Sequence, residues 1–194
     1  MNTYDSRRYA LINRWDASHL ERIDRLASIG AGDRVLEVGC GQGHLTKALA
    51  ARGVDIVGID ANPQAKEVAE SPLVRYMKAE SLEFDDASFD FVVSVHAIEH
   101  IPQLDAALAE MSRVLRADGR AVFIYPAEPI MGLYAIPTSI ILYGTPFKAR
   151  EVHCHKLWPS KLRGMVEPLG LNQVSSEFSL LWSPQFATLF EKVG

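Results

Sequence analysis

The chain has 194 residues, of which 48% are hydrophobic and 23% charged, a composition that suits one globular domain with a sizeable core. A formal net charge of −4 argues against nucleic acid as a partner, because phosphate binding usually needs a basic face. Cys40 and Cys154 are too few and too irregularly spaced for a disulfide framework or a zinc site, which indicates a reducing, cytoplasmic environment. Residues 1–8 lack the apolar core of a signal peptide, and no run of about 20 apolar residues predicts a membrane span.

Strand and helix patterns alternate along most of the chain. A helix is expected over residues 18–28, because Ser18 and Glu21 have the spacing of a capping box, and it belongs to an N-terminal helical arm over residues 1–30. Strands are expected at 35–38, 55–60, 74–78, 91–95, 120–125 and 173–181. Helices are expected between them at 45–51, 64–70, 104–115 and 161–169. This alternation predicts an α/β fold with a parallel sheet and right-handed crossovers.

The most informative stretch, residues 35–46, runs from an apolar strand into three alternating glycines, Gly39, Gly41 and Gly43. A backbone without side chains there lets a ligand lie directly against the main chain. The spacing differs from the Gly-x-Gly-x-x-Gly fingerprint of dinucleotide sites, and no Gly-Lys-Ser/Thr of a phosphate loop follows. Asp60 ends the next strand, where a carboxylate can accept hydrogen bonds from both ribose hydroxyls. The alternative for Asp60 is a solvated acid in a turn.

Together with Glu37, these glycines resemble motif I of the class I S-adenosylmethionine-dependent methyltransferases, in particular their small-molecule, type 11-like members. The resemblance covers residues 34–126 and implies S-adenosylmethionine as the cofactor, with the loop around its methionine part. It implies one domain over 1–194 with a three-layer αβα architecture, in which helices flank a Rossmann-like, doubly wound, mostly parallel sheet of about seven strands. Residues 183–194 must supply the antiparallel seventh strand, yet 186–192 fit a helix as easily, so we expect an irregular strand or a chain that stops short of it.

Two further stretches carry the resemblance and imply more cofactor contacts. Residues 77–84 resemble the family's adenine loop, although Lys78 stands where relatives usually have Asp. Ala79 can still offer its amide, and Glu80 is either an acceptor for the adenine amino group or a surface acid. Residues 94–101 resemble the segment after the fourth strand, whose backbone closes over the methionine end. The implied cofactor-binding set is Glu37, Gly39, Cys40, Gly41, Gly43, Asp60, Ala61, Ala79, Glu80, Ser94 and His96.

His100 is the candidate for a catalytic base, because imidazole titrates near neutrality. The alternative for His100 is a residue at a helix start whose ring is hydrogen-bonded to backbone, and His96 competes as a base or as a cofactor-lining residue. His153 and His155 would face the same way on a strand, but no complete ligand set stands nearby, so we predict no metal site. Relatives place this stretch beside the substrate, which implies that His153 or His155 lines the acceptor pocket.

Residues 126–147 are almost free of charge, and four prolines and two glycines exclude a spanning helix. Relatives commonly place a substrate-shaping insertion here, so we expect an apolar lid over 127–150. Such a lid implies an apolar substrate, contact with a membrane surface, or a partner that covers it. The alternative is a helix packed on the sheet, with a core of Ile130, Leu133, Tyr134 and Ile136. As a lid, its expected substrate-lining residues are Met131, Tyr134, Tyr143 and Phe147.

These features predict an enzyme that transfers a methyl group from S-adenosylmethionine to an O or N atom of a small, fairly apolar acceptor. Contact of residues 127–147 with a membrane or lipid is left open. The Asn/Asp-Pro-Pro-Tyr/Phe tetrapeptide of DNA and glutamine N-methyltransferases is absent after the fourth strand, which disfavours amino methylation of nucleic acid or protein. Two alternatives remain: a non-catalytic S-adenosylmethionine-binding regulatory or partner protein, and a nicotinamide oxidoreductase, which the glycine spacing disfavours.

Overall fold

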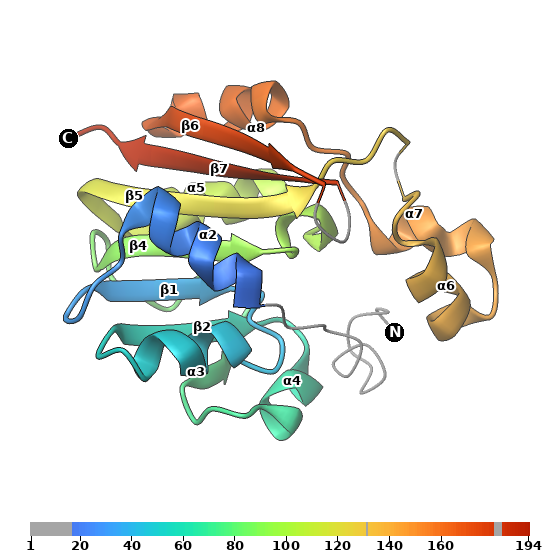
Figure 1. Ribbon diagram of the computed structural model, residues 1–194, viewed down its shortest axis with the longest axis horizontal. Coiled ribbons are helices and arrows are strands. Elements are labelled where there is room, and N and C mark those ends of the chain that lie inside the picture. The colour runs from blue at the N-terminus through green and yellow to red at the C-terminus, as the bar shows by residue number, and fades with distance from the viewer. Residues whose placement is uncertain (1–16, 131, 181–183) are drawn as a thin grey trace.

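The computed structural model describes residues 17–130, 132–180 and 184–194, which form one seven-stranded sheet with helices on both faces (Figure 1). The start of the expected N-terminal arm and Met131 lie outside these residues. The strands are β1 (Arg34–Val38), β2 (Asp55–Asp60), β3 (Val74–Tyr76), β4 (Phe89–Val95), β5 (Leu115–Pro126), β6 (Leu171–Ser179) and β7 (Gln185–Lys192). The α-helices are α2 (Ala17–Ala27), α3 (His44–Ala50), α4 (Pro63–Val68), α5 (Leu104–Val114), α6 (Ile136–Tyr143), α7 (Ala149–Val152) and α8 (Pro159–Val166). The 3-10 turns are η2 (Ile98–His100), η3 (Pro146–Lys148) and η4 (Glu167–Leu169).

The strand order is β3-β2-β1-β4-β5-β7-β6, with β1 to β5 parallel and β7 antiparallel to both of its neighbours. The direction in which strands are added reverses between β1 and β4. Ligands of doubly wound sheets bind at such a switch point, outside the carboxyl ends of the strands. In Figure 1 the arrowheads of β1, β4 and β5 point toward the side where α6 and α7 lie, so the segment expected to form a lid stands at the carboxyl edge of the sheet.

Two hydrophobic clusters fill the space between the sheet and its helices. Helices α2 and α3 cover one face, and α5 and α8 cover the other (Figure 1). Neighbouring residues of β4 alternate between the clusters: Val92 packs beneath α5 and α8, and Val93 beneath α2 and α3. This is why β4 is continuously apolar, as parallel strands buried on both faces are. The predicted three-layer, Rossmann-like architecture is confirmed, and the predicted strands and helices are present with shifted ends.

The expectation of an irregular or missing seventh strand is wrong. Strand β7 is regular and pairs with β5 throughout residues 185–191. It lies between β5 and β6, so both of its edges are paired. Both of its faces are also covered: Leu189 belongs to the cluster beneath α2 and α3, and Phe190 to the cluster beneath α5 and α8. Consecutive apolar residues replace the alternation of a half-exposed strand, which is why the sequence fits a helix as easily.

The alternative of a core helix within residues 126–147 is also wrong. Ile130 and Leu133 are 59% and 37% exposed, and α6 stands to the side of the sheet (Figure 1). A separate small cluster packs α6 against α7, made of Ala135, Ala149 and Val152 with Ile136 and Tyr143. The chain thus carries an apolar extension at the carboxyl edge of the sheet. Within the described ranges, no helix combines the length and the hydrophobicity required to cross a membrane.

Phe190→Ala should lower the free energy of unfolding by about 3–5 kcal/mol, because it removes a fully buried ring and leaves a cavity between the sheet and its helices. Phe178→Ala on β6 is the matched control. Phe178 is 55% exposed, so its loss should cost about 1 kcal/mol or less. Urea denaturation followed by circular dichroism measures both variants. Equal losses would contradict the internal position of β7.

Candidate functional site

The turn between β1 and α3 is a loop that strongly favours glycine. Gly39, Gly41 and Gly43 have φ angles of 76°, 51° and 76°, in the left-handed region that other residues rarely adopt. A Cβ atom at Gly39 would collide with the side chain of Ala97, and one at Gly43 would lie 2.5 Å from Val74 Cγ2. The loop therefore brings bare backbone to the carboxyl edge of the sheet, beside the segment that follows β4.

Asp60, the last residue of β2, holds this loop in place. Its Oδ2 accepts a hydrogen bond from the amide of Gly41 and its Oδ1 one from the amide of Asn62, each at 2.8 Å. Burial raises the pKa of the Asp60 carboxyl, and the two amides act in the opposite direction. Each carboxylate oxygen has a second lone pair. Asp60 can therefore accept hydrogen bonds from two vicinal hydroxyls next to the loop, and Ala61 beside it is exposed.

Glu37 lies beneath the loop. It is 4% exposed and accepts a hydrogen bond from Oγ1 of Thr46 at 2.5 Å, which joins β1 to α3. Burial raises the pKa of Glu37 to about 8, with a smaller contribution from the charge of Asp60, whereas the hydrogen bonds of Thr46 lower it. Glu37 is thus mostly protonated at neutral pH, and a cation bound next to it would favour its ionised form.

Cys40 and Ser94 are both buried at this edge of the sheet. Burial raises the pKa of the Cys40 thiol, so the thiolate that would make it reactive is disfavoured. The hydroxyl of Ser94 donates to the carbonyl oxygen of Val38 at 2.9 Å and joins β4 to β1. The side chain of Ser94 therefore has a structural partner within the sheet.

The loop after β3 also reaches the end of β2. The amide of Met77 donates to the carbonyl oxygen of Asp60 at 3.1 Å, which brings the beginning of this loop to the predicted ribose site. Further along the loop, Ala79 is buried and Glu80 is half-buried. The described residues thus bring the glycine loop, Asp60 and the predicted adenine segment to one edge, as three neighbouring strands end there.

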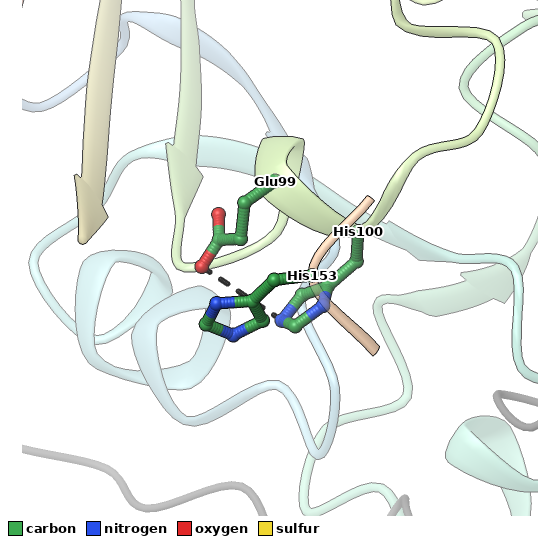
Figure 2. A group of neighbouring side chains, drawn as sticks. All are labelled: Glu99, His100 and His153. Carbon is green, nitrogen blue, oxygen red and sulfur yellow. Dashed lines mark ion pairs between the residues drawn. The ribbon is translucent and has the colours of Figure 1, made fainter. Parts of the chain in front are cut away.

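A second group of polar side chains lies after β4 (Figure 2). Glu99, in turn η2, is 1% exposed, and its Oε1 lies 3.6 Å from Nδ1 of His96 and 3.7 Å from Nε2 of His100. Burial alone would raise the pKa of Glu99, but the charges of His100, His96 and His153 and the hydrogen bond of His96 lower it to about 2. Glu99 is therefore an ionised carboxylate enclosed by histidines.

His100, the predicted base, is fixed by the backbone. Its Nδ1 lies 2.6 Å from the carbonyl oxygen of Val152, and because a carbonyl only accepts, Nδ1 carries the proton and Nε2 is directed at Glu99. Burial lowers the pKa of His100, although Glu99 acts in the opposite direction. The ring has the backbone hydrogen bond that the structural alternative requires, and in its neutral form Nε2 is the nitrogen that could act as a base.

His153 connects the lid to this group. Its Nδ1 lies 2.9 Å from Oε1 of Glu128, which is 1% exposed and also accepts hydrogen bonds from the amides of Gly132 and Tyr134. The rings of His100 and His153 meet edge to face, with centroids 4.7 Å apart (Figure 2). The segment after α7 thereby reaches both the start of the lid and the end of β4.

Glu99 and Glu128 are missing from the residues that the sequence predicts. Glu128 is the single charged residue between positions 126 and 147, and an acid isolated in an apolar segment is the signal that could have identified it. Glu99 directly precedes His100, but nothing in the local pattern indicates that its carboxylate is buried. Both residues acquire their role from contacts between segments that are distant in the chain.

His96 and His155 each have a further hydrogen-bond partner. His96 has a φ angle of 50°, and its Nε2 lies 2.8 Å from Oε1 of Gln185. Nε2 of His155 lies 2.8 Å from the carbonyl oxygen of Ile101. The segment that follows α7 is not a strand, and His153 and His155 bind different groups. The expectation that these two side chains face the same way on a strand is therefore wrong.

The predicted acceptor-lining residues of the lid are spread out. Tyr134 is half-buried and reaches the histidine group through its amide bond to Glu128. Tyr143 is half-buried, and Nζ of Lys148 lies 4.7 Å from the centroid of its ring. Phe147 is 92% exposed, so its ring stands at the surface. Of these three residues, only Tyr134 is hydrogen-bonded to the group of polar side chains, through Glu128.

The sequence matches the model of the methyltransferase domain family over residues 36–123. The ubiquinone biosynthesis O-methyltransferase of Pseudomonas syringae pv. tomato is 34% identical over 175 residues, which cover 84% of this chain and 73% of that protein. The Bacillus subtilis protein named uncharacterized methyltransferase YcgJ is 34% identical over 119 residues, which cover 55% of this chain and 47% of that protein. This chain spans 47–62% of the length of several curated relatives.

Among solved structures, the cyclase SpnF superimposes with a TM-score of 0.74 at 16% identity, over 91% of this chain and 81% of that chain. Identity this low shows a shared fold and nothing more. The sequence similarity to the Pseudomonas protein, together with the matching family model, shows the family. The chain belongs to the class I S-adenosylmethionine-dependent methyltransferase family.

Glu37→Gln should flatten the pH dependence of stability. The pKa of Glu37 rises from 4.5 to about 8 on folding, so between these values the folded state holds one more proton than the unfolded state. The contribution of Glu37 to the free energy of unfolding therefore falls by up to about 1.4 kcal/mol per pH unit as the pH rises through this range. Urea denaturation at several pH values compares the wild type with Glu37→Gln. A difference between them that stays constant with pH would contradict the raised pKa.

Proposed function

We propose that this protein transfers the methyl group of S-adenosylmethionine to an oxygen or nitrogen atom of a small, fairly apolar acceptor. The observation that carries the proposal is the glycine loop with Asp60 at its side: bare, left-handed backbone next to a carboxylate with lone pairs for two hydroxyls. S-adenosylmethionine offers a ribose with two vicinal hydroxyls and a positively charged sulfonium. The site thus has a complementary group for each.

The residues around the loop fit the remaining parts of this cofactor. Glycine at positions 39 and 43 lets the loop pass close to the side chains of Ala97 and Val74, and we place the methionine part against the bare backbone of this loop. Glu37 beneath the loop supplies a negative charge once a cation favours its ionised form. We place the adenine beside Ala79 and Glu80, because their loop is bonded to Asp60.

His100 is the residue of the chain that we place at the acceptor. The cofactor supplies a methyl group on a neutral leaving group, so the chain must mainly align the acceptor, exclude water and remove a proton. In the neutral ring of His100 the unprotonated nitrogen is Nε2, and Glu99 at 3.7 Å would stabilise the imidazolium that forms when the ring accepts a proton. His153, held by Glu128, and Tyr134 complete this end of the site.

The names of relatives and the lid support a small, apolar acceptor. Relatives include a demethylmenaquinone methyltransferase of Tropheryma whipplei and the ubiquinone biosynthesis O-methyltransferase of Pseudomonas syringae. In this chain the lid exposes Ile130, Ile140, Ile141 and Phe147 by 59%, 49%, 54% and 92%. An apolar acceptor, or a membrane surface that contains it, would cover side chains that are costly to leave in water.

Asp60→Ala should weaken the binding of S-adenosylmethionine by about 2 kcal/mol, or about thirtyfold in the dissociation constant, because it removes charge-assisted hydrogen bonds to the ribose. Asp55→Ala is the matched control, since Asp55 begins the same strand at its other end and its side chain is 75% exposed. Its affinity should equal that of the wild type. Isothermal titration calorimetry measures binding, and thermal melting verifies that both variants fold.

Three results would go against this proposal in different ways. An unchanged affinity of Asp60→Ala for S-adenosylmethionine would show that Asp60 does not bind the ribose. Binding of NAD without binding of S-adenosylmethionine would contradict the cofactor. Binding of S-adenosylmethionine without transfer of a radioactive methyl group to any hydroxylated or aminated apolar compound would support the non-catalytic binding protein instead.

A further inference from the structure

We propose that Glu99, His100 and His153 bind one divalent transition-metal ion at the acceptor end of the site. Each residue offers one ligand atom, and these atoms all lie within 4.8 Å of one another. Figure 2 shows the carboxylate of Glu99 directed toward the two imidazole rings. The sequence pattern predicts no such site, because His153 is distant from the other two residues in the chain and reaches them through the fold of the lid.

The separations between these groups suit a single ion. Oε1 of Glu99 and Nε2 of His100 are 3.7 Å apart. Two ligands that each bind an ion at about 2.1 Å with tetrahedral angles are about 3.4 Å apart. The rings of His100 and His153 meet at 68° with centroids 4.7 Å apart, so neither ring stacks on the other and each can direct a nitrogen at the same point. Small side-chain movements would complete the coordination.

Both histidines are held in the tautomer that a metal requires. Nδ1 of His100 lies 2.6 Å from the carbonyl oxygen of Val152, and Nδ1 of His153 lies 2.9 Å from Oε1 of Glu128. A carbonyl and an ionised carboxylate only accept hydrogen bonds, so in each neutral ring Nδ1 carries the proton and Nε2 presents its lone pair. Metal-binding histidines typically have this arrangement, in which an outer oxygen fixes the tautomer and the orientation of the ring.

Glu99 supplies the independent observation that points to a ligand. Glu99 is 1% exposed, and its Oε2 is buried without a hydrogen-bond partner among the described residues. A buried carboxylate oxygen with no partner is costly. Among the described residues, the basic side chains within 4.0 Å of the carboxylates of Glu99 and of the nearby buried Glu128 are all histidines. A divalent cation bound by both oxygens of the carboxylate would satisfy Oε2 and neutralise the buried negative charge.

The ligand set indicates the class of metal. Two imidazoles and one carboxylate suit Zn²⁺, Co²⁺ or Fe²⁺, whereas Ca²⁺ and Mg²⁺ prefer oxygen ligands. Three protein ligands leave coordination positions open, as catalytic sites do. The ion would also fix the lid, because Glu128 stands at its start and His153 directly follows α7 at its end.

The open positions suit a hydroxyl group of the acceptor, a role that rests on the proposed methyl transfer. A bound ion lowers the pKa of a hydroxyl that ligates it. The proton leaves to solvent, the oxygen lone pair forms the bond to the methyl carbon, and sulfur takes the electron pair of the broken carbon–sulfur bond. The acceptor atom is then oxygen, and His100 acts as a metal ligand in place of a base.

Metal binding by the full chain tests this proposal. Protein treated with EDTA and dialysed against Zn²⁺ or Co²⁺ should bind one ion per chain, measured by atomic absorption for Zn²⁺ and by visible absorption for Co²⁺. Glu99→Gln and His153→Gln should each weaken binding by about tenfold or more. His155→Gln is the matched control from the same segment, since its ring bonds the backbone of Ile101, and it should bind as the wild type does.

A second measurement keeps the result independent of how stable the variants are. Zn²⁺ should raise the Tm of the wild type and of His155→Gln, but much less that of Glu99→Gln or His153→Gln, because a ligand of the folded state stabilises it. No bound ion, or equal binding by all four proteins, would overturn the metal site. S-adenosylmethionine binding is measured on the same preparations: if it persists without metal binding, only the metal site fails, and if it is absent while metal binds, only the proposed function fails.

Discussion

The hydrogen bond from the amide of Gly41 to Asp60 is the interaction on which the rest of the candidate site depends. It holds a backbone with positive φ angles against the carboxyl end of β2. Because β1 lies between β2 and β4, the same loop touches Asp60 through Gly41 and closely approaches Ala97 through Gly39. Ala97 stands two residues before Glu99. The site has two halves: a proposed cofactor half around the glycine loop and Asp60, and a histidine half around Glu99, His100 and His153. The two halves meet at this loop, and a shift of its backbone would change the geometry of both.

The left-handed glycine loop, the position of Asp60 beside it and most of the fold could be predicted because their signals are local. Positive φ angles call for glycine, and a strand end falls at the edge of the sheet wherever the strand itself lies, which is how Asp60 could be identified from the sequence. The position of β7 could not be predicted in the same way. Leu189 and Phe190 face different cores, and that depends on which strands pair on either side of them.

The histidine half could not be predicted, since its chemistry depends on segments that meet only in the folded chain. Glu99 follows β4, Glu128 opens the lid, and His153 follows α7. Each of these residues is nearly buried and needs polar partners within the protein. Glu99 lies beside two histidines, and Glu128 beside His153 and two backbone amides of its own segment. The two carboxylates and the intervening rings thus fasten both ends of an otherwise apolar lid to the sheet, while the exposed apolar side chains of the lid remain on its outer part.

A crystal structure of the protein grown with S-adenosylhomocysteine tests the central claim, the placement of the methyl donor, most directly. We predict ribose hydroxyls bonded to Asp60, the amino-acid part against the backbone from Gly39 to Gly43, and the sulfur facing the segment that contains Glu99 and His100. Density for the ligand at another edge of the sheet, or ribose hydroxyls bonded to residues other than Asp60, would contradict that placement.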